Sequence, residues 1–280
     1  MRDVVGALTR RWNRRHGSGA EVADTPSNHW ATVNTAYRRL RDRGLAARPN
    51  YTWSMLHVGN IARHLGIDRL SAIEFGVAGG NGLVALDQVA GAVRDALGIH
   101  VDVHGFDTGA GLPPPRDHRD APFIMSGGDF PMDEARLRSR LSGAELHLGL
   151  VEDTLPAFLE RQPAPVAFVS VDVDFYSSAV AALKLFDAPA HLLFPRVLCY
   201  FDDVLGYPWG DFNGERLALS EFNASHSERK IAYLHGFKFV LPTEEFHTRW
   251  AESMYLTHIF DHPRYGDDEG TEITRRLDLS

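Results

Sequence analysis

The sequence predicts an α/β protein with a doubly wound, mostly parallel sheet, and three observations support this fold class. Apolar runs of strand length alternate with helical patterns from residue 71 onward. A glycine-rich turn joins the first run to the first helix, and several of the runs end in Asp or Glu. We expect this core to occupy residues 71–265, between an N-terminal helical segment, 1–70, and an acidic tail, 266–280.

The first strand and its turn are the most informative stretch. The apolar run 71–75 contains Glu74 and leads directly into a turn made of Gly76, Val77, Ala78, Gly79 and Gly80. Leu83, Leu86 and Val89 follow at helical spacing, so a helix N-terminus with unpaired N–H groups should face the turn. We therefore expect the turn to bind a polar ligand, although a plain strand-to-helix connection would have a similar sequence.

The residues of the turn also narrow the choice of ligand. A dinucleotide fingerprint counted from Gly76 needs Gly at 78 and Gly or Ala at 81, but the chain has Ala78 and Asn81. Glu74 would repel a pyrophosphate, whereas it can accept hydrogen bonds from a cationic or hydroxylated ligand. S-adenosylmethionine carries an ammonium, a sulfonium and a ribose, so it suits this turn better than a nicotinamide dinucleotide.

Composition and charge exclude several classes of protein. The chain has 280 residues, 44% hydrophobic and 24% charged, which suffices for a sizeable core. A net charge of −8 disfavours nucleic acid as a partner. Cys199 is the only cysteine, which excludes an internal disulfide and a multi-cysteine zinc site. No apolar run approaches the ~20 residues of a membrane helix. We expect a cytoplasmic protein with no membrane contact.

The segment 1–70 has helical periodicity with a polar break at 18–27. One helical face collects Trp30, Val33, Ala36, Tyr37 and Leu40, and 51–65 forms a second amphipathic segment. We expect these N-terminal helices either to cover the substrate side of the sheet or to build a homo-oligomer.

Acidic residues follow the second and third predicted strands. The alternating run 101–107 ends in Asp107 and Thr108, and in a doubly wound sheet that strand ends beside the first turn. Asp107 can thus accept hydrogen bonds from both ribose hydroxyls, although Asp is equally common as a turn former. The third strand is predicted at 145–150 and the next helix from Asp153, which places Val151 and Glu152 at the ligand-binding edge.

Two further strands deliver four carboxylates to the same edge. The run 166–171 ends in Asp172 and Asp174, and the run 196–201 ends in Asp202 and Asp203. Carboxylates this close repel unless a cation or a proton lies between them. Oxygen ligands favour Mg²⁺ first, then Ca²⁺ or Mn²⁺. Helix caps and solvated acids are the alternative interpretation.

The C-terminal part continues the alternation. We expect a helix over 214–225 and strands over 230–234, 237–240 and 254–260, with a hairpin at Gly236 that makes the closing strands antiparallel. The acidic tail after Gly266 is expected to fray.

Taken together, residues 50–205 resemble the class I S-adenosylmethionine-dependent methyltransferases, and among them the macrocin-type sugar O-methyltransferases. The motifs that carry the resemblance are 74–80, 105–108 with 111–113, 153–156, 172–178 and 201–203. The chain departs from the family at Gly109 and Ala110, where an aromatic residue and an acid are usual, and after Asp203. The resemblance implies a Rossmann-like fold and a Mg²⁺, or another divalent cation, held by Asp172, Asp202 and Asp203.

We therefore expect methyl transfer from S-adenosylmethionine to a hydroxyl of a small polar acceptor, a sugar or natural product. The catalytic residues would be Asp172 and Asp174, the latter taking the proton of a hydroxyl that the metal has acidified. The expected cofactor site comprises Glu74, Gly76, Val77, Ala78, Gly79, Gly80, Asp107, Thr108, Glu152 and Asp172. The alternatives are a nicotinamide-dependent oxidoreductase and a non-catalytic ligand-binding protein on the same fold.

Overall fold

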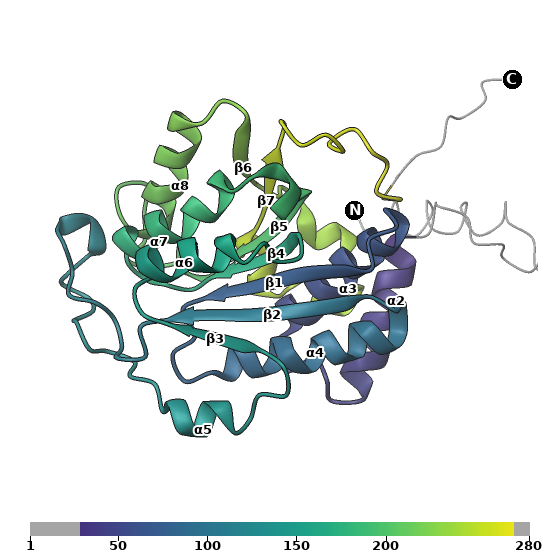
Figure 1. Ribbon diagram of the computed structural model, residues 1–280, viewed down its shortest axis with the longest axis horizontal. Coiled ribbons are helices and arrows are strands. Elements are labelled where there is room, and N and C mark those ends of the chain that lie inside the picture. Colours follow the sequence, from purple (N-terminus) through teal and green to yellow (C-terminus); the bar gives the residue numbers. More distant parts are fainter. Residues whose placement is uncertain (1–28, 272–280) are drawn as a thin grey trace, which may run out of the picture.

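The structure, a computed structural model, describes residues 29–271 and contains one seven-stranded sheet (Figure 1). The strand order is β3-β2-β1-β4-β5-β7-β6. Five strands are parallel: β1 (Arg69–Phe75), β2 (His100–Asp107), β3 (Glu145–Leu148), β4 (Val166–Val171) and β5 (Leu193–Phe201). β7 (Met254–Ile259) pairs antiparallel with both β5 and β6 (Arg229–Tyr233). The predicted fold class is confirmed, including the antiparallel closing strand.

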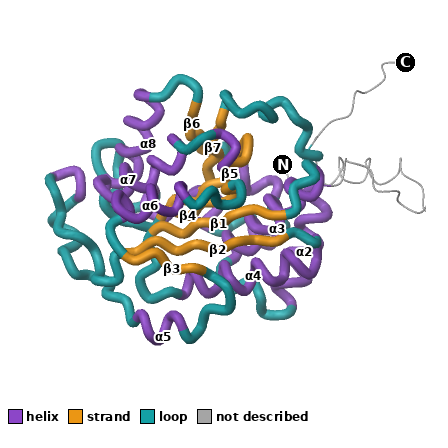
Figure 2. The backbone as a smooth tube through the Cα atoms, viewed as in Figure 1, coloured by secondary structure: helices purple, strands orange, loops and turns teal. Residues whose placement is uncertain are grey.

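Helices cover both faces of the sheet (Figure 2). One layer consists of α2 (His29–Asp42), α3 (Pro49–His64) and α4 (Asn81–Leu97), and the other of α6 (Val151–Glu160), α7 (Tyr176–Leu183) and α8 (Gly214–Ser225). The short α5 (Glu134–Arg138) precedes β3. Every residue of β4 is buried, as expected for a central strand between two helical layers.

The order in which strands are added to the sheet changes direction at β1, with β2 and β3 on one side and β4 and β5 on the other. The neighbours of β1 are β2, which follows it in sequence, and β4, reached by a crossover. The carboxyl ends of β1 and β4 therefore form the topological switch point, where open α/β sheets bind their ligands. The fold thus places the glycine turn and the strand-end acids around one crevice.

The second N-terminal helix differs from its prediction. The segment 51–65 was predicted to be amphipathic, but α3 is buried at every residue from Asn50 to Ala62. It lies between α2, α4 and the sheet, so it has no solvent-facing side over most of its length. Its buried polar residues have partners in the neighbouring helix: His57 and Asn60 each form a hydrogen bond of 2.8 Å with His29 of α2. The predicted break at 18–27 lies outside the described residues.

Three smaller predictions were also wrong. Residues Phe237–Val240, predicted to be a strand, form a 3-10 helix. The predicted hairpin at Gly236 is therefore absent, and β6 pairs instead with β7. β3 ends at Leu148 and α6 begins at Val151, so Glu152 belongs to the first turn of a helix.

The start of the predicted acidic tail packs against the sheet instead of fraying. Arg196 of β5 donates to the carbonyls of Tyr265 and Asp267 and pairs with the buried Glu269 at 2.8 Å. Among residues 29–271, no helix is long and apolar enough to span a bilayer.

Candidate active site

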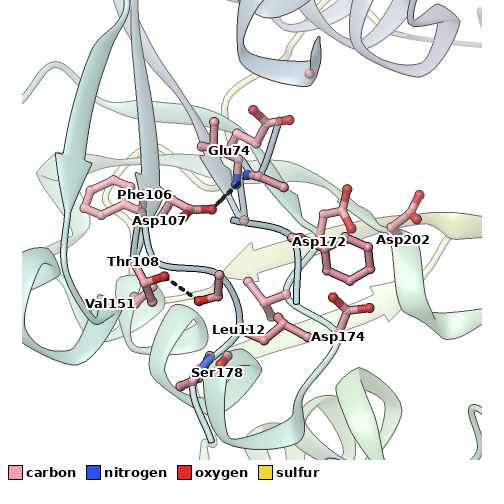
Figure 3. Close-up of a pocket in the computed structure, with 18 of the residues that line it drawn as sticks. Glu74, Phe106, Asp107, Thr108, Leu112, Val151, Asp172, Asp174, Ser178 and Asp202 are labelled. Atoms are coloured by element: carbon pink, nitrogen blue, oxygen red, sulfur yellow. Dashed lines mark hydrogen bonds between the residues drawn. The ribbon is translucent and has the colours of Figure 1, made fainter. Parts of the chain in front are cut away.

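A cavity of about 390 Å³ opens at the switch point. It lies at the carboxyl ends of the parallel strands, and Figure 3 shows Asp107 on one side of it and Asp172, Asp174 and Asp202 on the other. The lining includes every residue that the sequence predicted for cofactor, metal or catalysis: Glu74, Gly76, Val77, Ala78, Gly79, Gly80, Asp107, Thr108, Glu152, Asp172, Asp174, Asp202 and Asp203. The structure brings them together, while their individual roles stay predictions.

The turn after β1 needs glycine at two positions. Gly76 has a φ of +84°, and a Cβ there would lie 1.8 Å from the carbonyl oxygen of Asp172. Gly80 has a φ of +80°, and a Cβ would lie 2.2 Å from a methyl carbon of Leu137. Both positions combine a left-handed backbone with close packing, Gly76 against the end of β4 and Gly80 against the Leu137 side chain of α5.

Asp107 organises this turn from the end of β2. Its Oδ2 accepts hydrogen bonds from the N–H groups of Val77 and Ala78, each at 2.9 Å (Figure 3). Its Oδ1 accepts from Gly109 N at 2.7 Å. The N–H groups of Val77 and Ala78 are therefore bonded within the protein and do not face the cavity as free donors. A carboxylate oxygen has two lone pairs, so Asp107 keeps acceptor capacity toward the cavity.

Glu74 is a buried carboxyl with one unpaired oxygen. Its Oε1 accepts a hydrogen bond from the Tyr51 hydroxyl at 2.6 Å, but Oε2 is buried and has no partner among the described residues. Burial outweighs this hydrogen bond and raises the pKa of Glu74 to about 8. The start of α4 packs directly on the carboxyl, since a Cβ at Gly82 would lie 1.9 Å from Oε1. A cationic ligand would balance the charge of the ionised Glu74, and a hydroxyl-bearing ligand would donate a hydrogen bond to its unpaired Oε2.

The acids that follow β4 and β5 face one another across the same edge. Burial, then Asp202 and Asp203, raise the pKa of Asp172 to about 7. Burial, then Asp172 and Asp202, raise the pKa of Asp174 to about 7, and burial, then Asp174 and Asp202, raise the pKa of Asp203 to about 8. Asp203 Oδ2 accepts a hydrogen bond from Asp174 N at 3.0 Å. Asp172, Asp174 and Asp203 thus lie in a partly desolvated region, whereas Asp202 beside them is exposed to solvent.

Glu215 is a fifth acid of this group that the sequence did not reveal. It lies in the first turn of α8 and is fully buried. Its Oε2 accepts a hydrogen bond from Asp203 N at 3.1 Å, and its Oε1 has no partner in the described chain. Burial, then Asp203, raise its pKa well above the usual range. In the sequence, an acid in a first helical turn needs no explanation beyond the helix dipole.

The donor set of this edge fits a hard divalent cation. All the side-chain donors are carboxylate oxygens, and they carry more negative charge than the neighbouring cations balance. No three of these carboxylates, all of them among the described residues, place ligand atoms within 4.8 Å of one another, so the side chains must move closer together to hold an ion. In residues 29–271 that criterion is met by His104, Glu145 and His147, which lie elsewhere in the fold.

Arg48 is a cation in this acidic cavity that the sequence also did not reveal. It precedes α3, whose first residue is Pro49, and it lines the cavity. Burial lowers its pKa, but the charges of Tyr51, Glu74 and the strand-end acids outweigh this and raise it. Its guanidinium makes no hydrogen bond or ion pair within residues 29–271, whereas Arg116 pairs with Glu152 at 2.8 Å. Arg48 is therefore available to an anionic group of a ligand.

The long connection 108–130 closes one side of the cavity. Asp120, only 1% exposed, accepts hydrogen bonds from Ser177 N at 2.8 Å and from Ser177 Oγ at 3.0 Å at the start of α7. It also accepts from Arg116 N at 2.7 Å. Leu112 and Phe130, near the two ends of the connection, line the cavity.

Of three comparisons with known proteins, the one with solved structures found proteins of the same fold. Neither a protein-family model nor a curated protein matches the chain. Among solved structures, the calicheamicin methyltransferase CalS11 matches with a TM-score of 0.51 and 18% identity, over 79% of this chain and 95% of that one. The chain shares its fold with that methyltransferase. At this identity the likeness extends to the fold alone.

Two further structures are similar at lower scores. The O-methyltransferase TomG from Streptomyces achromogenes, solved with S-adenosylmethionine, has a TM-score of 0.44 and 16% identity over 90% of this chain and 96% of that one. The mycinamycin-pathway methyltransferase MycE, solved with Mg, S-adenosylhomocysteine and mycinamycin VI, has a TM-score of 0.36 and 15% identity over 81% of this chain and 54% of that one. These lower scores support no inference about ligand or metal.

Proposed function

We propose that the protein transfers the methyl group of S-adenosylmethionine to a hydroxyl of a small polar acceptor, a sugar or natural product, with the help of a divalent cation. The observation that carries the proposal is that the buried Glu74, whose Oε2 is unpartnered among the described residues, lines the same cavity as the group of carboxylates that follows β4 and β5. The first suits a cationic, hydroxylated cofactor, and the second suits a hard metal ion.

The same geometry disfavours a nicotinamide dinucleotide. A pyrophosphate needs free backbone N–H groups at the glycine turn, but those of Val77 and Ala78 are bonded to Asp107. Glu74 and Asp107 also line this part of the cavity, and both would repel a diphosphate when ionised.

The cofactor would lie along the turn 76–80. In this proposal Glu74 compensates its positive charge, and Asp107 accepts hydrogen bonds from the ribose hydroxyls through its remaining lone pairs. Thr108 and Glu152 line the adenosine end, and Arg48 binds the carboxylate of the methionine moiety. Arg48 lies among Glu74, Asp172 and Asp202, so a ligand carboxylate there would meet the cavity's available cation.

The metal would be held by Asp172, Asp202 and Asp203, with Mg²⁺ as the first candidate. When bound, it would lower the pKa of the acceptor hydroxyl. Asp174 then takes the hydroxyl proton while the acceptor oxygen forms a bond to the methyl carbon and the carbon–sulfur bond breaks, leaving S-adenosylhomocysteine. In the metal-free protein, burial and the neighbouring carboxylates raise the pKa of Asp174 to about 7, which favours acceptance of a proton. The protein's main contribution is the in-line alignment of oxygen, carbon and sulfur.

The proposal is tested by methyl transfer from labelled S-adenosylmethionine to a panel of hydroxylated sugars and natural products, with Mg²⁺ or with excess chelator. We expect chelator to abolish transfer and to leave S-adenosylmethionine binding intact, since the metal would contact the acceptor. Asp203→Asn should raise the Mg²⁺ concentration needed for half-maximal rate. Full activity in excess chelator would overturn the metal requirement.

A further inference from the structure

A second cluster of ionisable side chains lies on β2 and the edge strand β3. Figure 1 shows these two strands side by side. In the parallel register His104 is opposite Glu145 and Phe106 is opposite His147, so His104, Glu145 and His147 project from the same face of the sheet. His147 Nε2 lies 3.3 Å from His104 Nδ1, which lies 3.7 Å from a Glu145 carboxylate oxygen. One ligand atom from each residue lies within 4.8 Å of the other two.

Two of the three separations are close to the edge length of a metal coordination tetrahedron, and the third is at most 4.8 Å. Zinc–nitrogen and zinc–oxygen bonds of roughly 2.0–2.1 Å place neighbouring ligand atoms of a tetrahedral site roughly 3.3–3.4 Å apart. The separations of 3.3 and 3.7 Å are close to that value. A small closing movement of the three side chains would therefore complete three corners of a zinc site.

The protonation states also suit a metal. Burial lowers the pKa of His104 to about 4 and lowers the pKa of His147 as well, so both imidazoles are neutral at pH 7. The hydrogen bonds from Arg161 lower the pKa of Glu145, which is therefore ionised. Neutral imidazole and carboxylate are the forms that bind metal ions.

We propose that His104, Glu145 and His147 bind a borderline transition-metal ion, with Zn²⁺ as the first candidate. His104 Nδ1, His147 Nε2 and one oxygen of Glu145 supply three ligands, and water from the adjoining groove between Asp87 and Arg161 supplies the fourth. This site differs in chemistry from the all-carboxylate edge. It does not depend on the proposed methyl transfer.

Two contacts of the cluster bear on the binding of an ion. Arg161 holds Glu145 with hydrogen bonds of 2.5 and 2.9 Å, one to each carboxylate oxygen. Each oxygen keeps a second lone pair, and the Arg161 side chain is 56% exposed, so it can adjust its position. His104 Nε2 has no partner in the described chain, so the polar contacts of that imidazole lie within the cluster.

The ion would fasten the edge strand to its neighbour. β3 is four residues long and pairs only with β2 among the described strands. It leads through Gly149 and Leu150 to Glu152, all three of which line the main cavity. A metal bridge between β2 and β3 would thus stabilise one wall of that cavity without touching its ligands.

The test uses the full-length protein, freed of any histidine tag and of metal, titrated calorimetrically with ZnCl₂. With excess MgCl₂ present to occupy the carboxylate edge, we expect one saturable Zn²⁺ site. It should be lost or weakened at least about 10-fold in both His147→Gln and Glu145→Gln and retained in His100→Gln, an exposed histidine of the same strand as His104. Asp203→Asn should also retain it. Saturating Zn²⁺ should raise the unfolding midpoint of the wild type by roughly 5 °C and leave that of His147→Gln unchanged.

The result that would overturn the proposal is the absence of saturable Zn²⁺ binding to the wild type. Binding that survives in both His147→Gln and Glu145→Gln, with circular dichroism showing both variants folded, would overturn it too. If either variant is unfolded, the wild-type titration followed by the absorption of bound Co²⁺ decides the matter, since a four-coordinate N/O site gives intense visible bands and free Co²⁺ does not. Weak Co²⁺ bands typical of the hydrated ion would contradict the site.

Discussion

Glu74→Gln should make the ligand-free protein more stable at alkaline pH and weaken its binding of S-adenosylmethionine. The substitution keeps the shape of the side chain and an oxygen that can accept the Tyr51 hydrogen bond. It removes the ability to ionise. The two effects are opposite in sign because a buried carboxylate without a ligand is costly, whereas the same carboxylate beside a cationic ligand is favourable.

The magnitude follows from the pKa of Glu74, about 8 in the folded protein against an ordinary value of 4.5. Between these two values the folded state holds a proton that the unfolded state lacks, so the free energy of unfolding falls as pH rises. At 1.36 kcal/mol per pH unit the loss reaches at most about 5 kcal/mol by pH 8, and relaxation of the cavity reduces it to a few kcal/mol. The variant does not suffer this loss. Its advantage should be small at pH 5 and about 2–4 kcal/mol at pH 8.

The assay is denaturant unfolding of both proteins at several pH values, with calorimetric titration of S-adenosylmethionine at pH 8. Losing a charge-assisted contact of about 1.5–3 kcal/mol should raise the dissociation constant roughly 10- to 150-fold. Parallel pH profiles of unfolding free energy for the two proteins would refute the raised pKa. Equal cofactor affinity would refute the role of Glu74 at the cavity.

Three further predictions concern the same cavity. Arg48→Gln should abolish a preference of about 10-fold or more for S-adenosylmethionine over its decarboxylated analogue; an unchanged preference would place the ligand carboxylate elsewhere. Asp107→Asn should raise the dissociation constant of S-adenosylhomocysteine more than that of its 2′-deoxy analogue, and equal losses would mean that Asp107 only shapes the turn. Asp174→Asn should lower kcat at least about 100-fold with little change in the Mg²⁺ requirement, whereas a shifted requirement with normal kcat would make Asp174 a metal ligand.

The parts of the fold that were predictable from sequence are those with local signals. The acid and glycines of 74–80 mark the end of β1, and the paired acids at 172–174 and 202–203 mark two buried strands. Parallel strands end at one edge, so these local signals also predicted which residues meet in the cavity. The helix over 214–225 was predicted with its observed bounds.

The residues missed depend on tertiary contacts that no spacing encodes. Glu215 reaches Asp203 across the loop 204–213, and Arg48 enters the cavity because α3 packs inside the fold. The interpretation of 51–65 as amphipathic failed because the polar residues of α3 are satisfied by partners such as His29. Likewise, 237–240 has strand-like composition, but β7 takes the pairing position beside β6.

The central claim is that the cavity at the switch point binds S-adenosylmethionine, and calorimetric titration of the wild type with S-adenosylmethionine, S-adenosylhomocysteine and NAD tests it most directly. We predict one binding site for each of the first two ligands and at least about 100-fold weaker binding of NAD. Asp107 occupies the N–H donors of Val77 and Ala78 that a pyrophosphate would need, and an ionised Glu74 would repel it. NAD binding as tight as that of S-adenosylmethionine, or no binding of either adenosyl ligand, would contradict the account.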